Sequence, residues 1–522
     1  MAKKEKKLFT REATGLVREV RVLDSVIFNI IAIIGVGPVL FLAQVSLFPG
    51  ANLPLTLLMF IVPAFFTFML YRELSISMPR SGGDYIYVSR IINPGVGFVG
   101  SVLAWMGALL SLGVIVFYFV YILDTVFSLG LAANPIMFLL VGTGFLALMT
   151  LQSIFKAAGF KIFRYAFIIA AILTVVLFVS LLSINTATFI ANWNAGPLGS
   201  AGLTYAGVQS LATTLADSNG NFWSSSFTIG ATFMAIIFPM TYVLGFGSTQ
   251  VGGELKDYKK SLTYALFVTL IGMTVFYLLL TLVTFNAFGQ NFLTSYGWTY
   301  WYAPDPLHTI LQSAPPALIL FMNFGGLDTT LLLLSALGML IWSYMMIPAA
   351  TLLWSRYVFA WSFDRVTPMR FGDVNERTRS PVWAIVVSAI VVWFGFIGTS
   401  LSLALVGIVY YLSLYLWTAI VGISGILFAR RKKDIYQKSP IKGSVLKVQK
   451  VTWAGIITAI YFIISIPLIF LYPTALIPYA PIGIAITAAA LIAAILIYFR
   501  SKSKNRAAGI DVDKIFGEIP PE

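Results

Sequence analysis

The chain has 522 residues, of which 59% are hydrophobic and only 10% are charged, and its mean hydropathy is +0.90. Soluble domains carry about 25% charged residues, so this composition excludes a water-soluble globular protein and indicates an all-α polytopic membrane protein. The absence of cysteine excludes disulfides and cysteine nucleophiles, and the single histidine, His308, is expected in an outer loop as a surface residue. We therefore expect no enzyme, no metal site and no cofactor.

Apolar runs that are long enough to cross a bilayer core, which takes about 20 helical residues, predict about twelve membrane spans. In chain order, the helices are expected near residues 25–48, 52–73, 95–127, 134–153, 160–184, 225–250, 260–287, 328–358, 381–399, 402–429, 452–472 and 475–499. No cleavable signal peptide is expected, because a basic tail leads directly into a full-length span.

The basic residues predict the orientation of these spans. All 34 lysines and arginines fall in the two tails and in the loops after predicted spans 2, 4, 6, 8 and 10. Because cytoplasmic loops are enriched in basic residues, we expect both termini in the cytoplasm and the protein in the cell membrane. The net charge of +14 then needs no nucleic-acid partner, and the partners are the lipid bilayer and a small molecule.

Both charged tails are expected to be flexible. Two long segments between the predicted spans are expected on the outer side of the membrane. Residues 185–224 are rich in Gly, Asn, Ser and Thr and are interpreted as a loop with at most short helical pieces. Residues 286–327 are rich in aromatic residues and include Trp298 and Trp301. This density predicts an interfacial cap on the membrane surface.

Predicted spans 1 and 6 are interrupted, whereas most of the others are not. Span 1 contains Gly35–Val36–Gly37–Pro38, and span 6 contains Phe238–Pro239 and Gly245–Phe246–Gly247. One such interruption is explained by a kink or by close helix packing, but two at corresponding positions point to the binding site of a transporter. Spans five apart run in opposite directions, which predicts an inverted repeat of five plus five helices.

The chain therefore divides into a basic tail, two repeats, connecting loops and two peripheral helices. The predicted boundaries are a tail at 1–23, the first repeat at 24–185, an outer loop at 186–224, the second repeat at 225–429, a basic loop at 430–451, peripheral helices at 452–499 and a tail at 500–522.

The broken helices predict how a zwitterion is held. Helix N-termini offer N–H donors to a carboxylate, and helix C-termini offer carbonyls to an ammonium or a sodium ion. The donors are expected from Gly35, Gly37 and the turn after Pro38, and the carbonyls from residues 238–244. The predicted membrane interior is nearly free of ionisable residues, which argues against a side-chain proton relay and against a strongly cationic substrate.

Several stretches resemble the amino acid–polyamine–organocation permease superfamily, in the order usual for that superfamily. They are Gly35–Val36–Gly37, the loop sequence MPRSGGDYIYVSR from Met78 to Arg90, Gly245–Phe246 with Glu254–Leu255–Lys256, and Ser355–Arg356 followed by Asp364–Pro368 and Ser380–Pro381. The resemblance implies a LeuT-type five-plus-five inverted repeat with broken helices 1 and 6, plus two peripheral helices. It also implies alternating access and amino acid substrates.

The resemblance implies a substrate site at the two breaks. Gly35, Val36 and Gly37 would meet the carboxylate; Ile33, Phe238 and Thr241 would offer carbonyls to the amine; Phe238 or Tyr242 would form an aromatic gate beside Gly245. Val36 stands where many members have serine, and Gly247 stands where many have glutamate.

The sequence leaves three modes of transport open: coupling to H⁺, coupling to Na⁺, and exchange. Lys161 lies near the inner end of span 5, where some relatives use a lysine for protons, and Ser343 and Thr351 on span 8 are candidates for a sodium site. Arg18 or Arg21 is predicted to pair with Asp364 as an inner gate.

The predicted function is a secondary active permease for neutral or apolar amino acids. The alternatives are a transporter of polyamines or other organic amines, which an acidic residue facing the Gly35 and Gly245 breaks would favour, and a non-transporting amino acid sensor.

Overall fold

The structure is a computed structural model that describes residues 18, 20–34, 50–219, 227–237, 246–304, 306–401, 403–471, 480–510 and 512–518, with the backbone alone at 156–161, 216–219, 237, 312, 403–404, 471 and 512–513. Within these residues, ten helices are long and apolar enough to cross a membrane, and they match ten of the predicted spans. The expected all-α architecture is confirmed, because a two-stranded hairpin is the one sheet in the described part of the chain.

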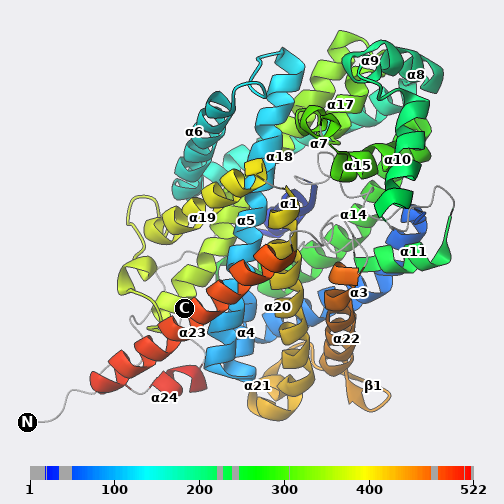
Figure 1. Ribbon diagram of the computed structural model, residues 1–522. Helices are drawn as coiled ribbons and strands as arrows, with labels where there is room; N and C mark the ends of the chain where they lie inside the picture. The colour runs from blue at the N-terminus through cyan, green and yellow to red at the C-terminus, as the bar shows by residue number, and fades with distance from the viewer. Residues whose placement is uncertain are drawn as a thin grey trace, which may run out of the picture.

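The elements follow one another along the chain as labelled in Figure 1. They are α1 (Val22–Ile34), α3 (Leu53–Ser77), α4 (Gly83–Ile91), α5 (Pro94–Phe127), α6 (Pro135–Ile154), α7 (Lys156–Ser183), α8 (Thr186–Ala195), α9 (Pro197–Ser200), α10 (Tyr205–Asn219), α11 (Ile229–Met234), η1 (Ala235–Ile237), α13 (Gly247–Gln250), η2 (Gly252–Glu254), α14 (Tyr258–Phe288), α15 (Gln290–Tyr302), α16 (Leu307–Gln312), α17 (Leu318–Asn323), α18 (Thr329–Phe363), η3 (Met369–Gly372), α19 (Val382–Leu401), α20 (Leu403–Arg431), α21 (Lys433–Lys438), β1 (Ser444–Val445), β2 (Val448–Gln449), α22 (Lys450–Leu471), α23 (Ala480–Ala507) and α24 (Val512–Gly517).

Side-chain caps define where several long helices begin. Asn52, Asn93 and Asn134 accept hydrogen bonds from backbone N–H groups in the first turns of α3, α5 and α6, and a proline follows within two residues in each case. Asparagine satisfies otherwise unpaired N–H groups, and proline suits the first helical turn because it has no N–H to lose. Asp257 and Asp328 cap α14 and α18 in the same way.

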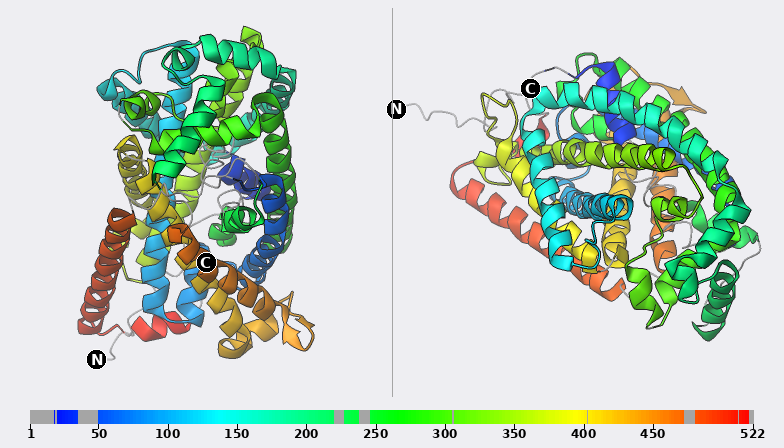
Figure 2. Two further views of the ribbon diagram at one scale, coloured as in Figure 1. Left: turned by 45° about the vertical axis from the view of Figure 1, so that its right-hand side comes forward. Right: turned by 90° about the horizontal axis from the view of Figure 1, so that it is seen from above.

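The two ends of the helical bundle differ (Figures 1 and 2). Helices α8, α9, α10, α15 and α17 gather at one end, which we call the cap. Helices α4, α21 and α24 and the β1–β2 hairpin lie at the opposite end, which we call the basic end because the lysine- and arginine-rich connections run there. Helix α23 packs along the outside of the bundle against α5 and α20.

The cap is more ordered than the sequence suggests. Residues 205–219 form a fifteen-residue helix, α10, where a loop with short helical pieces was expected. Val208, Ala212 and Leu215 are buried and follow a helical spacing, so this face packs against α15. Trp298 and Tyr300 are also buried, so part of the aromatic density expected at the membrane surface fills the inside of the cap.

The carboxyl-terminal segment, which was expected to be flexible, includes a docked helix. Helix α24 contacts α4 and α23, and its residues Ile515 and Phe516 are buried. The Phe516 ring lies 4.8 Å from the guanidinium carbon of Arg90. Helix α24 therefore covers part of the basic end.

Candidate functional site

Helix α1 and the start of helix α13 meet inside the bundle. The described part of helix α1 has 13 residues, Val22–Ile34, and the predicted interruption at residues 35–38 lies outside the described residues. Helix α13 begins at Gly247 and contacts α1. The side-chain oxygen of Asn29 accepts a hydrogen bond of 2.9 Å from the backbone N–H of Ser248. This bond links α1 to the first turn of α13.

The carbonyl of Ile33 lies in the last turn of α1, where the sequence predicts an acceptor for the substrate amine. It accepts a hydrogen bond of 2.9 Å from the hydroxyl of Tyr277 on α14. A carbonyl oxygen has two lone pairs, so this bond takes up one acceptor position and orients the group. Helix C-terminal carbonyls carry partial negative charge that suits a cation.

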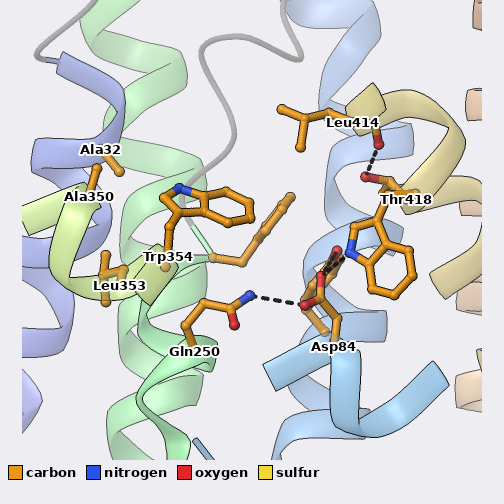
Figure 3. Close-up of a pocket in the computed structure, with 12 residues that line it drawn as sticks. Ala32, Asp84, Gln250, Ala350, Leu353, Trp354, Leu414 and Thr418 are labelled. Atoms are coloured by element: carbon orange, nitrogen blue, oxygen red, sulfur yellow. Dashed lines mark hydrogen bonds between the residues drawn. The ribbon is translucent and has the colours of Figure 1, made fainter. Parts of the chain in front are cut away.

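A cavity lies beside these ends (Figure 3). Two helices at the predicted interruptions contribute to it, α1 through Ala32 and α13 through Gly247 and Gln250, together with Phe246 immediately before α13. The remaining lining comes from other helices and is formed by Tyr71, Asp84, Ala350, Leu353, Trp354, Leu414, Trp417 and Thr418. Most of the described wall is apolar or aromatic, and Asp84 is the one acidic residue among the described lining residues.

Asp84 accepts hydrogen bonds from four neutral donors on four other elements. At one carboxylate oxygen, the donors are Tyr71 of α3 at 3.0 Å and Trp417 of α20 at 2.8 Å. At the other oxygen, they are the side-chain amide of Gln250 at 3.0 Å and the hydroxyl of Tyr357 of α18. Burial raises the pKa of Asp84, and the hydrogen bonds from these donors act against that increase.

Two glycines bring Asp84 to this position. Gly82 has φ +99° and Gly83 has φ +46°, a left-handed backbone that side chains rarely adopt. A Cβ atom at Gly82 would lie 2.6 Å from the Cβ of Ala360, and one at Gly83 would lie 2.8 Å from Oε1 of Gln250. The Gly-Gly pair of the loop motif therefore lets the start of α4 pack directly against α18 and α13.

The basic end is closed by buried ion pairs below this cavity. Arg90 of α4 binds both carboxylate oxygens of Asp364, with distances of 2.6 and 2.7 Å, and Tyr85 donates to the same carboxylate at 2.7 Å. Arg356 binds Glu254 at 2.7 Å. The side chains of both pairs are 0% exposed.

The structure therefore gives Asp364 a different partner from the predicted one. Arg18 and Arg21 are exposed, whereas Asp364 is fully buried and both of its carboxylate oxygens are bound by Arg90. The reason is local: α4 presents Arg90 in its last turn directly beside the residue that ends α18. At α1, Asp24 pairs instead with Arg164 of α7 at 2.7 Å.

The other predicted site residues fall into two groups. Gly35, Val36, Gly37, Phe238, Thr241, Tyr242 and Gly245 lie outside the described residues, as does the side chain of Lys161. Ser343 and Thr351 are buried, and neither hydroxyl has a hydrogen-bond partner among the described residues. They are eight residues apart on α18, about 12 Å along the axis, so one sodium ion cannot contact both.

Asp84 is the residue that sequence reasoning missed. Hydropathy places it in a polar loop, whereas the structure buries it inside the bundle, 2% exposed. The Gly-Gly pair before it is the signal that could have found it, because paired glycines permit the close approach described above. Among the described residues, no group of three or more His, Asp or Glu side chains could hold a metal ion.

Comparison with known proteins agrees with this architecture. The fold is similar to that of MhsT, whose crystal structure is a complex with L-phenylalanine: the TM-score is 0.50, the sequence identity is 15%, and the match covers 88% of this chain and 99% of MhsT. At this identity the likeness shows the fold, a LeuT-type arrangement of helices. Among curated proteins, none matches the sequence. The profile of the amino acid permease family matches residues 22–506, and the chain therefore belongs to this family of the amino acid–polyamine–organocation superfamily.

Proposed function

We propose that the protein is a secondary active transporter of neutral amino acids that works by alternating access. The observation that carries this proposal is the meeting of α1 and α13 at one cavity inside the bundle. Helix ends at that depth present backbone groups to a ligand where water cannot satisfy them. The excess of basic residues at one end supports a cytoplasmic location for that end and for both termini, in the cell membrane.

The cavity wall supports an apolar or aromatic amino acid as substrate. Phe246, Leu353 and Trp354 line the cavity, and Figure 3 shows Leu353 and Trp354 on the same segment of α18. Such a wall binds an apolar side chain by removing its surface from water, while the helix ends hold the charged backbone of the amino acid. The binding of L-phenylalanine by MhsT makes phenylalanine the first substrate to test.

An organic amine is the second candidate substrate, because Asp84 faces the cavity near the interruptions. A cation would have to displace neutral donors, since each oxygen of the carboxylate already accepts two hydrogen bonds. A carboxylate offers about four acceptor positions. This saturation favours a zwitterion, held by backbone groups, over an amine, held by Asp84.

Uptake into proteoliposomes tests the proposal. Labelled amino acids and labelled polyamines are offered separately, with imposed proton gradients, sodium gradients or neither. We expect accumulation of apolar amino acids, and the gradient that drives it identifies the coupling ion. If Ser343 or Thr351 contributes to a sodium site, a sodium gradient drives uptake and alanine at that position abolishes the dependence.

A matched pair of glycine variants locates the pathway. A Cβ at Gly247 would lie 2.6 Å from Leu353, whereas a Cβ at Gly272 has nothing within 4 Å. Overpacking costs about 1–3 kcal/mol, so Gly247→Leu should weaken apparent affinity roughly 5- to 150-fold, and Gly272→Leu should not. Equal effects of the two variants would contradict a pathway at α13. Specific binding without flux would favour a sensor, and polyamine uptake alone would favour the amine transporter.

A further inference from the structure

Asp84 is a buried carboxylate that the substrate site does not require. Within the described part of the chain, its side-chain hydrogen bonds are with neutral groups: Tyr71, Gln250, Tyr357 and Trp417. An ionised carboxylate removed from water without a cation is unfavourable unless hydrogen bonds stabilise it, and such a group tends to take up a proton. Its charge in the closed structure therefore depends on four hydrogen bonds.

The charged groups around Asp84 are matched with each other. Helix α18 brings Arg356, paired with Glu254, and ends at Asp364, which is paired with Arg90 of α4. Helix α20 faces Asp84 with Trp417, and α13 faces it with Gln250. The other titratable groups that face it are hydroxyls, those of Tyr71, Tyr87 and Tyr357. No cation in the described residues is left to neutralise Asp84.

Gln250 allows Asp84 to be hydrogen-bonded in either protonation state. Its amide nitrogen donates to the carboxylate, while its oxygen, Oε1, is buried and has no hydrogen-bond partner among the described residues. The oxygen and nitrogen of an amide side chain occupy nearly equivalent positions. Rotation of the amide by half a turn would place Oε1 where it accepts the proton of a neutral Asp84 carboxyl.

The contacts of Asp84 also join the two predicted repeats. Asp84 and Tyr71 belong to residues 24–185, whereas Gln250, Tyr357 and Trp417 belong to residues 225–429. Alternating access in such proteins moves one repeat or bundle against the other. Opening the basic end would therefore separate Asp84 from donors in the second repeat and admit water to its carboxylate.

We propose that Asp84 is a proton-binding site of the gate at the basic end, which holds a proton while this end is closed and releases it to water when this end opens. The proposal rests on the transport function proposed above. The proton leaves the carboxyl oxygen for a water molecule, so that the charged carboxylate is hydrated in the open state.

The sign of the pH dependence follows from burial. Burial raises the pKa of Asp84 in the closed structure, and hydration returns it towards the ordinary range for aspartate. A state in which the carboxyl has the higher pKa is favoured by protonation. The closed state is therefore favoured at low pH, and this preference is lost as the pH rises through the closed-state pKa.

The test uses the absence of cysteine in the chain. Ala32→Cys places a single thiol on the cavity wall, and a membrane-impermeant maleimide is applied to vesicles that expose the basic end. Leu446→Cys, at a residue that is 83% exposed in the β1–β2 turn, corrects for the pH dependence of thiol reactivity. We expect corrected labelling of Ala32→Cys to rise about tenfold or more as the pH is raised, with a midpoint above the ordinary pKa of aspartate.

Two variants on this background decide the role of Asp84. Asp84→Asn cannot ionise, so labelling should be low and independent of pH. Tyr357→Phe removes one donor to the carboxylate and should move the midpoint up by about 1 to 2 pH units. Tyr205 is the control, because its hydroxyl donates to the carbonyl of Phe288 in the cap. Tyr205→Phe should leave the midpoint of the pH dependence of labelling unchanged.

The proposal is overturned if wild-type labelling is flat with pH, if Asp84→Asn keeps the dependence, or if Tyr357→Phe does not move the midpoint. Should Asp84→Asn fail to fold, Tyr357→Phe with its Tyr205→Phe control gives the decision. If the protein takes up amino acids but labelling does not change with pH, the proton site is refuted and the transport function stands. Normal pH-dependent labelling without uptake of any amino acid would contradict the transport function instead.

Discussion

The buried pair of Arg90 and Asp364 gives the most quantitative prediction for the closed basic end. It joins α4, in the first predicted repeat, to the end of α18 in the second, through contacts of 2.6 and 2.7 Å. Arg90→Met would leave the Asp364 carboxylate fully buried with Tyr85 as its one remaining side-chain donor in the described structure. Removing one partner of such a pair costs about 3–5 kcal/mol.

This cost acts on the closed state, because opening would hydrate Asp364. The equilibrium between closed and open should shift towards open by roughly 100- to 4,000-fold, at about 1.4 kcal/mol per factor of ten. Labelling of Ala32→Cys from the basic end, relative to Leu446→Cys, measures the shift. We expect labelling of Arg90→Met to be at least about tenfold above the parent.

The double variant Arg90→Met/Asp364→Leu is the control, because replacing a buried pair by apolar residues of similar volume is often neutral. It should label much less than Arg90→Met. Thermal unfolding of each variant separates gate opening from loss of stability. Parent-like labelling together with parent-like stability for Arg90→Met would refute the assignment of this pair to the closed gate.

Three further predictions concern other contacts. A Cβ at Gly113 would lie 2.0 Å from the backbone of Gly395 where α5 crosses α19. Gly113→Leu should therefore abolish the monodisperse peak of the protein on size-exclusion chromatography. Gly144→Leu is the control and should preserve this peak, because a Cβ at Gly144 has nothing within 4 Å. Tyr277→Phe removes the hydroxyl that orients the Ile33 carbonyl; a loss of about 0.5–1.5 kcal/mol should raise the KM for uptake roughly 2- to 12-fold, with no change for Tyr264→Phe on a residue that is 57% exposed. Phe516→Ala removes the ring beside Arg90, which should loosen α24 and speed tryptic cleavage after Lys514 several-fold. An unchanged cleavage rate would show that α24 does not dock through this residue.

The membrane spans could be predicted from the sequence because a single physical requirement, enough apolar residues to cross the bilayer, determines them. Ten helices in the described residues, from Leu53–Ser77 to Ala480–Ala507, lie where hydropathy predicted them. The helix α10 was missed because polar Ser, Thr and Gln residues separate the buried positions Val208, Ala212 and Leu215, so its composition resembles that of a loop.

The site was predictable only in part, because long-range pairing leaves no periodic signal. The Ile33 carbonyl, predicted from the glycines that follow it, is bound by Tyr277, whereas the predicted break at Gly35 and Gly37 lies outside the described residues. The partner of Asp364 could not be deduced, since Arg90 is 274 residues away in sequence and belongs to a short helix that hydropathy does not detect. Asp84 was missed for the same reason: its burial depends on contacts with three later helical segments.

Counterflow tests the central claim most directly, because it needs no knowledge of the coupling ion. Proteoliposomes that contain the purified protein are loaded with unlabelled phenylalanine and diluted into a trace of labelled phenylalanine, beside Gly247→Leu and Gly272→Leu. The account predicts transient accumulation of label above equilibrium for the wild type and Gly272→Leu, and its loss in Gly247→Leu. Saturable binding without accumulation for any apolar amino acid would contradict transport through the cavity between α1 and α13.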